Sequence, residues 1–318
     1  MTYPHSLSYL PRDFIATRCG LVFAVMAHHL EGDKVLGFLR YLQKDGRFHK
    51  LHTEEANQYL AEQQPDYLFS SKRLDALLHG IPVADIHQHY KPRLALRELL
   101  TGVSHDPVIR AAQHLCRLLA NNGLTPDQVG ITGSLLLGAQ GPNSDIDLVI
   151  YDRLAFFNAR MAIEQLMARG EIQALAECDW QDAYTRRGCE LSFEEYVRHE
   201  RRKLNKGKIA GIKFDISLVT EGSLPFPDNA TKAGYHRLQA RVVNTDRSFD
   251  YPAIYRLDHP DISEAWSFIQ TYAGQAFVGE WIEVRGLLET GSCGEQRIVV
   301  GSSREAPGEY IKTIRNPH

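Results

Sequence analysis

Three aspartates in two apolar segments form the most informative pattern in the sequence. Asp145 and Asp147 flank Ile146 in the segment DIDLVIY, and Asp215 interrupts the apolar run of GIKFDISLV. Side chains two residues apart on a β-strand point to the same face. Asp145 and Asp147 therefore share a face, and Asp215 lies opposite the apolar side chains of its own segment. If the two strands are neighbours, three carboxylates converge on one side of a sheet.

Such a group of carboxylates is typical of a site for hard cations. Clustered carboxylates repel one another unless cations lie between them. Mg²⁺ is usually held by a few carboxylates together with substrate phosphates. Two ions about 3.5–4 Å apart clamp the attacking and leaving oxygens of an in-line displacement. We therefore predict that Asp145, Asp147 and Asp215 bind two Mg²⁺ ions, with Mn²⁺ as the alternative ion.

A Gly-Ser pair precedes these carboxylates at a suitable place. Gly133 and Ser134 follow the apolar segment VGIT, which predicts a buried strand, and precede LLLGA, which predicts one helical turn. A glycine allows close backbone approach to a phosphate. A serine hydroxyl and the free N–H groups at a helix start bind anions. The pair therefore predicts a contact with phosphate.

Together these motifs resemble the signature of the DNA polymerase β-type nucleotidyltransferase superfamily. The pattern is Gly133-Ser134, a spacer of ten residues, and then Asp145-Ile146-Asp147 in an apolar strand, with a third acidic residue on a later strand. The string GSLLLG…SDIDLVIY particularly resembles the small nucleotidyltransferase domains of prokaryotes. The resemblance covers roughly residues 105–220.

The resemblance implies a Mg²⁺-dependent transfer of a nucleoside monophosphate from ATP or another nucleoside triphosphate to an acceptor, with release of pyrophosphate. Gly133 and Ser134 would hold the β- and γ-phosphates. Asp145 and Asp147 would bind both ions, and Asp215 would bind the ion that activates the nucleophile and would accept its proton. Many minimal members carry an arginine shortly after the Gly-Ser pair, where this chain has the leucines 135–137.

A basic segment at residues 197–208, VRHERRKLNKGK, precedes the strand of Asp215. Arg198, Arg201 and Arg202 are spaced to share one helical face, and we interpret them as nucleotide-binding residues. The alternative is a solvated helix face. Asp179 and Asp182 are rivals of Asp215 as the third carboxylate, although they lie in a helical or loop context.

The sequence predicts an α+β protein of three domains: a small α+β domain at 1–100, the nucleotidyltransferase domain with a mixed sheet at 101–225, and an all-β, OB-like domain at 226–318. We expect a strand hairpin within 12–44, helices at 53–63 with Thr53 as N-cap and at 71–80 ending at Gly80, and a turn-like segment at 82–93. Further helices are expected at 106–122, 154–169 and 192–206. Pro225 and Pro227 predict a linker, and short β-type runs follow it.

Composition narrows the class of protein. A formal net charge of −3 excludes a histone-like polycation but not local contacts with nucleic acid. The five cysteines are odd in number and irregularly spaced, which favours free thiols in a reducing compartment. We expect neither a signal peptide nor a membrane-spanning segment, and hence a cytoplasmic protein.

The favoured acceptor of the transferred nucleotide is RNA. Transfer to a protein or small molecule, and a non-catalytic nucleic-acid-binding or regulatory module, are the alternatives; the oligomeric state is undetermined by the sequence.

Overall fold

The computed structural model describes residues 9–221, 231–291, 293–303 and 306–316. It is an α+β protein with three sheets. The chain forms two compact units, of which unit 1 comprises Met1–Ser71, Leu77–Ala159 and Ile209–Leu224, and unit 2 comprises Lys72–Ala76, Arg160–Lys208 and Pro225–His318. The expected three-domain division stays a prediction, and the expected linker at Pro225 and Pro227 lies outside the described residues.

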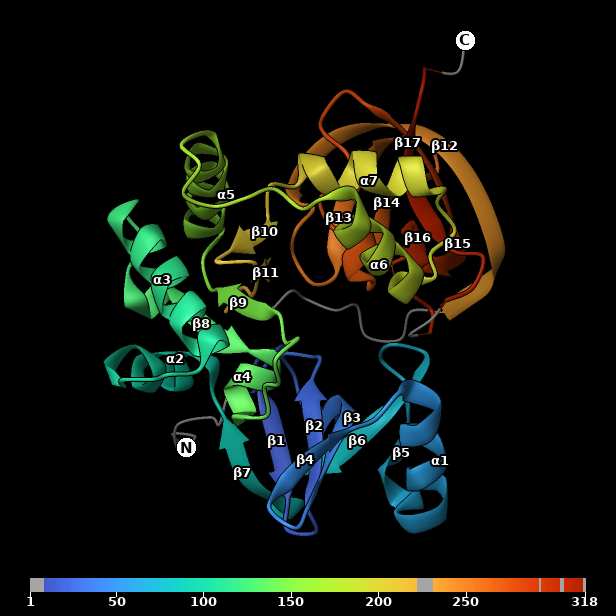
Figure 1. Cartoon of the computed structure of the whole chain (residues 1–318). Helices are drawn as coiled ribbons and strands as arrows, with labels where there is room; N and C mark the ends of the chain where they lie inside the picture. The colour runs from blue at the N-terminus through green and yellow to red at the C-terminus, as the bar shows by residue number, and fades with distance from the viewer. Residues whose placement is uncertain (1–8, 222–230, 292, 304–305, 317–318) are drawn as a thin grey trace, which may run out of the picture. The chain divides into compact units, whose positions relative to one another are not determined.

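Unit 1 contains a seven-stranded sheet with the order β5-β6-β3-β2-β1-β7, in which β4 also pairs with β3. Its strands are β1 (Phe14–Thr17), β2 (Leu21–Val25), β3 (Lys34–Lys44), β4 (Arg47–Lys50), β5 (Leu68–Ser71), β6 (Ala76–Pro82) and β7 (Ile86–Tyr90). Helix α1 (Thr53–Gln63) lies beside this sheet (Figure 1). It buries Ala56 and Leu60 in one core of the sheet. The antiparallel pairing of β2 with β3 confirms the expected hairpin.

Three local predictions for this region are wrong. The cap of α1 is His52 rather than Thr53, which is the first helical residue. Residues 71–80 do not form a helix, because their second half belongs to β6, which pairs with β3. Gly80 lies within this strand, where the Phe69 side chain leaves no room for a Cβ atom. The segment at 82–93 is not merely a turn, since β7 pairs with β1 and the next helix begins at Pro92.

A second sheet carries the acidic motif. Its order is β10-β11-β9-β8, with β8 antiparallel to β9 and β9 parallel to β11. The strands are β8 (Val129–Thr132), β9 (Ile146–Ile150), β10 (Lys206–Ile209) and β11 (Ile212–Leu218), and the helices that precede or join them are α2 (Pro92–Thr101), α3 (Pro107–Asn121), α4 (Gly133–Leu137) and α5 (Arg153–Ala168). The expected strand, helical turn and strand at 129–150 are confirmed.

Unit 2 contains helices α6 (Glu177–Arg187) and α7 (Phe193–Arg202) and a six-stranded sheet. Helix α7 is shorter than the predicted 192–206, because Leu204 takes a positive φ and the chain then enters β10. The strands are β12 (Thr231–Arg247), β13 (Ala253–Asp258), β14 (Ile262–Ser267), β15 (Trp281–Thr290), β16 (Gln296–Val300) and β17 (Tyr310–Ile314).

The long strand β12 pairs with both β13 and β15, so the order β12-β13-β14-β16-β15 closes into a ring of five strands, with β17 added beside β15. Trp180 of α6 and Tyr196 of α7 pack into the same core as Val242, Tyr255 and Ile282 of the ring. None of the helices within the described ranges is long and apolar enough to cross a membrane.

Candidate active site

The two aspartate-bearing strands are neighbours, which is the condition under which the sequence analysis expects their carboxylates to converge. Strands β9 and β11 run parallel, and Asp147 is the direct register partner of Asp215. Register partners in adjacent strands project to the same face of a sheet. Asp145 lies two residues before Asp147, immediately ahead of β9. All three aspartates are half-buried, while Ile146, Phe214 and Ile216 on the opposite face are buried.

Gly133 lies against the carboxylate of Asp147. It follows β8, whose last residue Thr132 is the other register partner of Asp147. Its φ of +67° favours glycine, and a Cβ atom at this position would lie 2.4 Å from Oδ2 of Asp147. Both the backbone conformation and the close approach therefore require a glycine, and they bring the start of α4 into contact with the acidic strand.

Ser134 is linked to the loop that leads into β9. Its Oγ donates a hydrogen bond to Oγ of Ser144 over 3.2 Å, and the same Ser144 oxygen accepts from the backbone N–H of Gly141 over 3.0 Å. Ser144 immediately precedes Asp145. The Gly-Ser pair and the acidic motif are thus connected both through Gly133 and through Ser134.

Lys213 is a member of this face that the sequence reasoning missed. Its Nζ lies 3.8 Å from Oδ1 of Asp145, and both side chains are partly exposed. On β11, Lys213 and Asp215 are two residues apart, as Asp145 and Asp147 are around β9. The same period-two argument, applied to the basic residue as well as to the acidic ones, would have placed it here.

Two residues of the seven-stranded sheet, Arg40 and Tyr41 of β3, also interact with this region, and the sequence analysis did not single them out. Tyr41 of β3 packs in one apolar cluster with Leu136 and Leu137 of α4. Burial raises the pKa of the Tyr41 hydroxyl, and the positive charge of Arg40 opposes this rise. Burial lowers the pKa of the Arg40 guanidinium, whereas Tyr41 and the Asp147 carboxylate raise it. The charges of Arg40 and Asp147 therefore interact.

The donor set suits a hard divalent cation. Asp147 and Asp215 present carboxylate oxygens from adjacent register positions, and Asp145 adds a third carboxylate at the same end of β9. Among the described residues, no three His, Cys, Asp or Glu side chains are already grouped as ligands of one ion. Mg²⁺ commonly takes one or two carboxylates and completes its shell with water and phosphate oxygens, and the pair Asp147–Asp215 fits that requirement.

The predicted nucleotide-binding arginines lie on α7, in unit 2, whereas the aspartates lie in unit 1. Arg198 donates to the carbonyl oxygen of Thr313 over 3.2 Å. Arg202 donates to both carboxylate oxygens of Glu280 over 2.8 Å. Arg201 is exposed. Two of the three guanidinium groups thus form hydrogen bonds to residues of unit 2. A nucleotide-binding role for Arg198, Arg201 and Arg202 stays a prediction.

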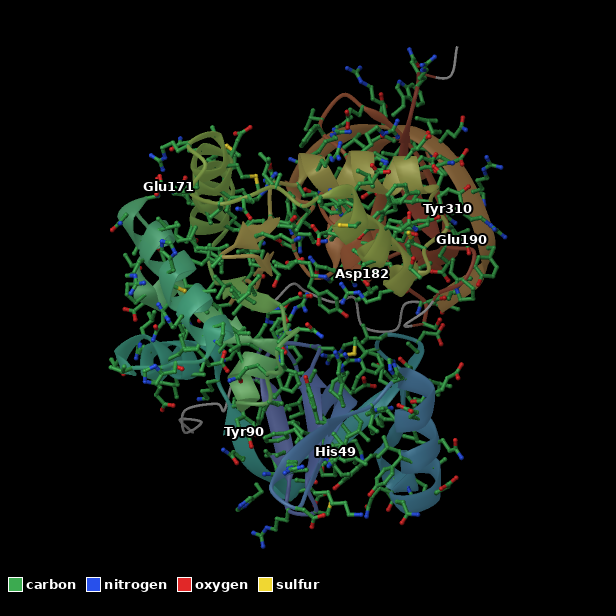
Figure 2. All side chains as sticks on the ribbon, viewed as in Figure 1. His49, Tyr90, Glu171, Asp182, Glu190 and Tyr310 are labelled. Carbon is green, nitrogen blue, oxygen red and sulfur yellow. The ribbon has the colours of Figure 1, made fainter. Side chains whose placement is uncertain are left out.

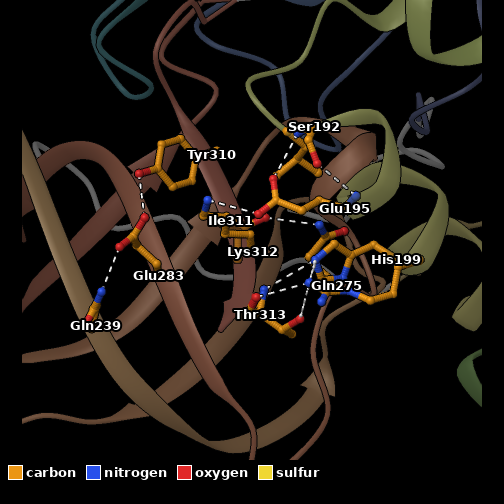
Figure 3. A network of polar contacts seen from close by, with 12 residues as sticks. Ser192, Glu195, His199, Gln239, Gln275, Glu283, Tyr310, Ile311, Lys312 and Thr313 are labelled. Carbon is orange, nitrogen blue, oxygen red and sulfur yellow. Dashed lines mark hydrogen bonds and ion pairs between the residues drawn. The ribbon is translucent and has the colours of Figure 1, made fainter. Parts of the chain in front are cut away.

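Helix α7 is attached to β17 by a polar network (Figure 3). Lys312 Nζ lies 3.1 Å from Oε1 of Glu195, and the N–H of Thr313 donates to Nε2 of His199 over 3.4 Å. Burial, together with the positive charge of Arg198, lowers the pKa of His199 to about 3. His199 is therefore neutral at pH 7, and the basic segment has a structural function in unit 2.

The rival carboxylates Asp179 and Asp182 lie on α6, also in unit 2. Asp179 forms an ion pair with Lys208 over 2.6 Å. Asp182, which is labelled in Figure 2, forms one with Arg186 of the same helix over 3.3 Å. Neither lies on the sheet of Asp147, so Asp215 is the carboxylate that the structure pairs with the acidic motif.

Comparisons with known proteins give one full-length relative. The chain is 34% identical over 335 aligned residues to the "Uncharacterized protein MJ1086" of Methanocaldococcus jannaschii, and the alignment covers 96% of this chain and 98% of that protein. No family model matches the chain. No solved structure matches it either.

Proposed function

We propose that this chain, which belongs to the same protein family as the uncharacterized protein MJ1086, is a Mg²⁺-dependent nucleotidyltransferase. It would transfer a nucleoside monophosphate from a nucleoside triphosphate to an acceptor and release pyrophosphate. The observation that carries the proposal is the in-register pair of Asp147 and Asp215, with Gly133 closed against Asp147 and Ser134 beside it. A carboxylate pair next to a glycine-dependent turn suits the binding of cations together with phosphates.

The residues have distinct roles in this proposal. Asp145, Asp147 and Asp215 hold Mg²⁺, which when bound neutralises charge on the phosphates. Asp215 accepts the proton of the attacking hydroxyl. The hydroxyl oxygen then forms a bond to the α-phosphorus as the bond between that phosphorus and the β-phosphate oxygen breaks, and pyrophosphate leaves with the electron pair. Gly133 allows the phosphates to approach the backbone, and the Ser134 hydroxyl turns from Ser144 Oγ to donate its hydrogen bond to a phosphate oxygen.

The proposed acceptor is RNA. The five-stranded ring of β12-β13-β14-β16-β15 resembles an OB-fold, a small barrel that often binds oligonucleotides. Tyr235 of β12 is 55% exposed, and the guanidinium of Arg285 on β15 lies 5.5 Å from its ring centre. Exposed aromatic rings beside arginines are typical platforms for stacked bases. These features support RNA as the acceptor, ahead of a protein or a small molecule.

The test is to incubate the purified protein with each nucleoside triphosphate labelled with ³²P at the α-position, Mg²⁺ and total cellular RNA. Asp147→Asn is the informative variant. Asp45→Asn is its matched control, because Asp45 is an exposed carboxylate with a positive φ that asparagine also tolerates. We expect label in RNA with the unaltered protein and the control, and a loss of about a thousandfold with Asp147→Asn, corresponding to about 4 kcal/mol of transition-state stabilisation.

The other outcomes separate the alternatives. Label on protein or on a small product, lost with Asp147→Asn, would keep the reaction and replace the acceptor. Absence of transfer to any acceptor, with equal behaviour of Asp147→Asn, would favour a non-catalytic module and contradict the proposal.

A further inference from the structure

Strand β3 contains a β-bulge whose extra residue is Arg40. In the pairing of β2 with β3, Val22 lies opposite Tyr41 and Phe23 lies opposite Leu39, so Arg40 has no partner residue on β2. Residues two apart on a regular strand share a face, but here Leu39 and Tyr41 belong to cores on opposite faces. The bulge thus redirects the strand at Arg40. Bulges of this kind are frequent beside active sites, where they re-aim a side chain.

The face to which the bulge turns Tyr41 is the face that carries α4. Tyr41 packs in one cluster with Leu136 and Leu137, which follow Ser134 within α4. The backbone is fixed at a second point, because the hydroxyl of Thr132 donates to the carbonyl oxygen of Arg12 over 2.7 Å. Residues of the N-terminal region therefore contact the segment around Gly133 at two points, and Arg40 is adjacent in sequence to one of them, Tyr41.

The Arg40 guanidinium is half-buried and lies within the electrostatic influence of the Asp147 carboxylate without forming a hydrogen bond to it. Among the described residues, none accepts a hydrogen bond from it or lies within 4.0 Å as an ion-pair partner. Its positive charge and the negative charge of the Asp147 carboxylate nevertheless attract each other. A partly desolvated guanidinium without a hydrogen-bond acceptor is unfavourable, and a phosphate supplies two acceptors in a geometry that matches its planar fork.

We propose that Arg40 is a phosphate-binding residue of the candidate active site, and that it binds the β- and γ-phosphates of the nucleoside triphosphate. Helix α4 has the sequence GSLLL and carries no basic side chain of its own, so the seven-stranded sheet supplies the cation from a different part of the chain. The inference rests on the proposed function and extends it, because it assigns a role in substrate binding to the N-terminal region.

The experiment measures binding of inorganic tripolyphosphate in the presence of Mg²⁺ by isothermal titration calorimetry. Tripolyphosphate carries the phosphates without a base, so the result does not depend on which nucleotide is used. The variants of the full chain are Arg40→Met, which keeps the apolar stem and removes the charge, and Arg40→Lys, which keeps the charge and removes the planar fork. Arg47→Met on β4 is the matched control, because Arg47 is an exposed arginine of the same sheet.

We expect Arg40→Met to weaken binding by about 10- to 100-fold, the usual effect of losing a hydrogen bond to a charged group. Arg40→Lys should lose less, and Arg47→Met should bind like the unaltered chain. If Arg40→Met does not give a cooperative melting curve, Arg40→Lys decides the question through its partial loss.

Two results would overturn the inference, and they differ. Equal binding by the unaltered chain and the Arg40 variants would exclude Arg40 as a phosphate ligand and leave the proposed function intact. Failure of the unaltered chain to bind tripolyphosphate with Mg²⁺, together with failure to transfer nucleotide, would overturn the proposed function and this inference with it.

Discussion

Replacement of Gly133 by alanine tests the geometry of the candidate site most sharply. The new Cβ atom would lie 2.4 Å from Oδ2 of Asp147, whereas Cβ atoms essentially never approach another atom within 3.0 Å. The carboxylate or the turn must therefore move by at least about 0.6 Å. A misplacement of about 1 Å in an active site can reduce the rate by about 10²-fold. The backbone adds a separate effect, because the φ of +67° is unfavourable for alanine by roughly 1–2 kcal/mol.

Gly138, at the C-cap of the same short helix, provides a matched control. Its φ is +65°, nearly the same as that of Gly133, but a Cβ atom there would meet nothing within 4 Å. Gly138→Ala should therefore lose a similar free energy of unfolding, roughly 1–2 kcal/mol, without displacing Asp147. The difference in activity between the two variants isolates the contact between Gly133 and the carboxylate.

The assay compares the initial rate of nucleotide transfer and the midpoint of urea unfolding for both variants and the unaltered protein. We expect both variants to unfold at similarly lowered urea concentrations, and only Gly133→Ala to lose activity, by about 100-fold. Equal activity of the two variants would refute the reasoning, because it would show that the position of Asp147 relative to the turn does not matter.

Three further predictions concern the carboxylates and the interior of unit 2. Asp215→Asn should abolish the rise in melting temperature that Mg²⁺ with tripolyphosphate produces in the unaltered protein, and an unchanged rise would exclude Asp215 as a ligand. Glu200 is buried between Lys203 and Lys206, so Glu200→Gln should lower the free energy of unfolding at pH 7 by about 3–5 kcal/mol in urea titrations; a change below 1 kcal/mol would contradict this. Burial lowers the pKa of His199 to about 3, so the unfolded chain takes up a proton below pH 6.5 that the folded chain does not. Stability should fall by about 1.4 kcal/mol per pH unit from this residue as pH decreases from 6.5 towards 3, and His199→Gln should remove that part of the slope.

The acidic motif was predictable because its signal is local. Period-two alternation placed Asp145, Asp147 and Asp215 opposite apolar residues, and the structure confirms the strands and shows that they are adjacent. The sequence predicted that Gly133 lets the backbone approach a phosphate, and this stays a prediction. The structure shows a different close approach at Gly133, to the carboxylate of Asp147.

The wrong prediction of a helix at 71–80 arose because hydrogen bonding between strands, and not local sequence preference, decides the structure of this segment. The segment at 71–80 contains good helix formers, yet β6 forms because β3 offers it hydrogen-bond partners on one edge. A glycine such as Gly80 is common at the end of a helix. Here it instead leaves space for the Phe69 side chain, which packs against its backbone. The choice between helix and strand therefore depends on residues about forty positions earlier in the chain, and the local sequence pattern does not reveal it.

The position of Arg40 could not be predicted for a related reason. A bulge is a property of two paired strands, and only the register of β2 against β3 reveals it. Similarly, the sequence showed Arg198 and Arg202 as a basic helical face, but the partners that bind them, Thr313 and Glu280, lie far along the chain. These hydrogen bonds within unit 2 form because α7 packs against the six-stranded sheet.

The measurement that tests the central claim most directly compares nucleoside triphosphates labelled at the α-phosphate with those labelled at the γ-phosphate, in parallel reactions with Mg²⁺ and cellular acceptors. Attack at the α-phosphorus attaches the α-label to the acceptor and leaves the γ-label in pyrophosphate. We predict this result for the unaltered protein and its loss in Asp147→Asn. Transfer of the γ-label, or transfer of the α-label that persists in Asp147→Asn, would contradict a nucleotidyltransferase site at Asp147 and Asp215.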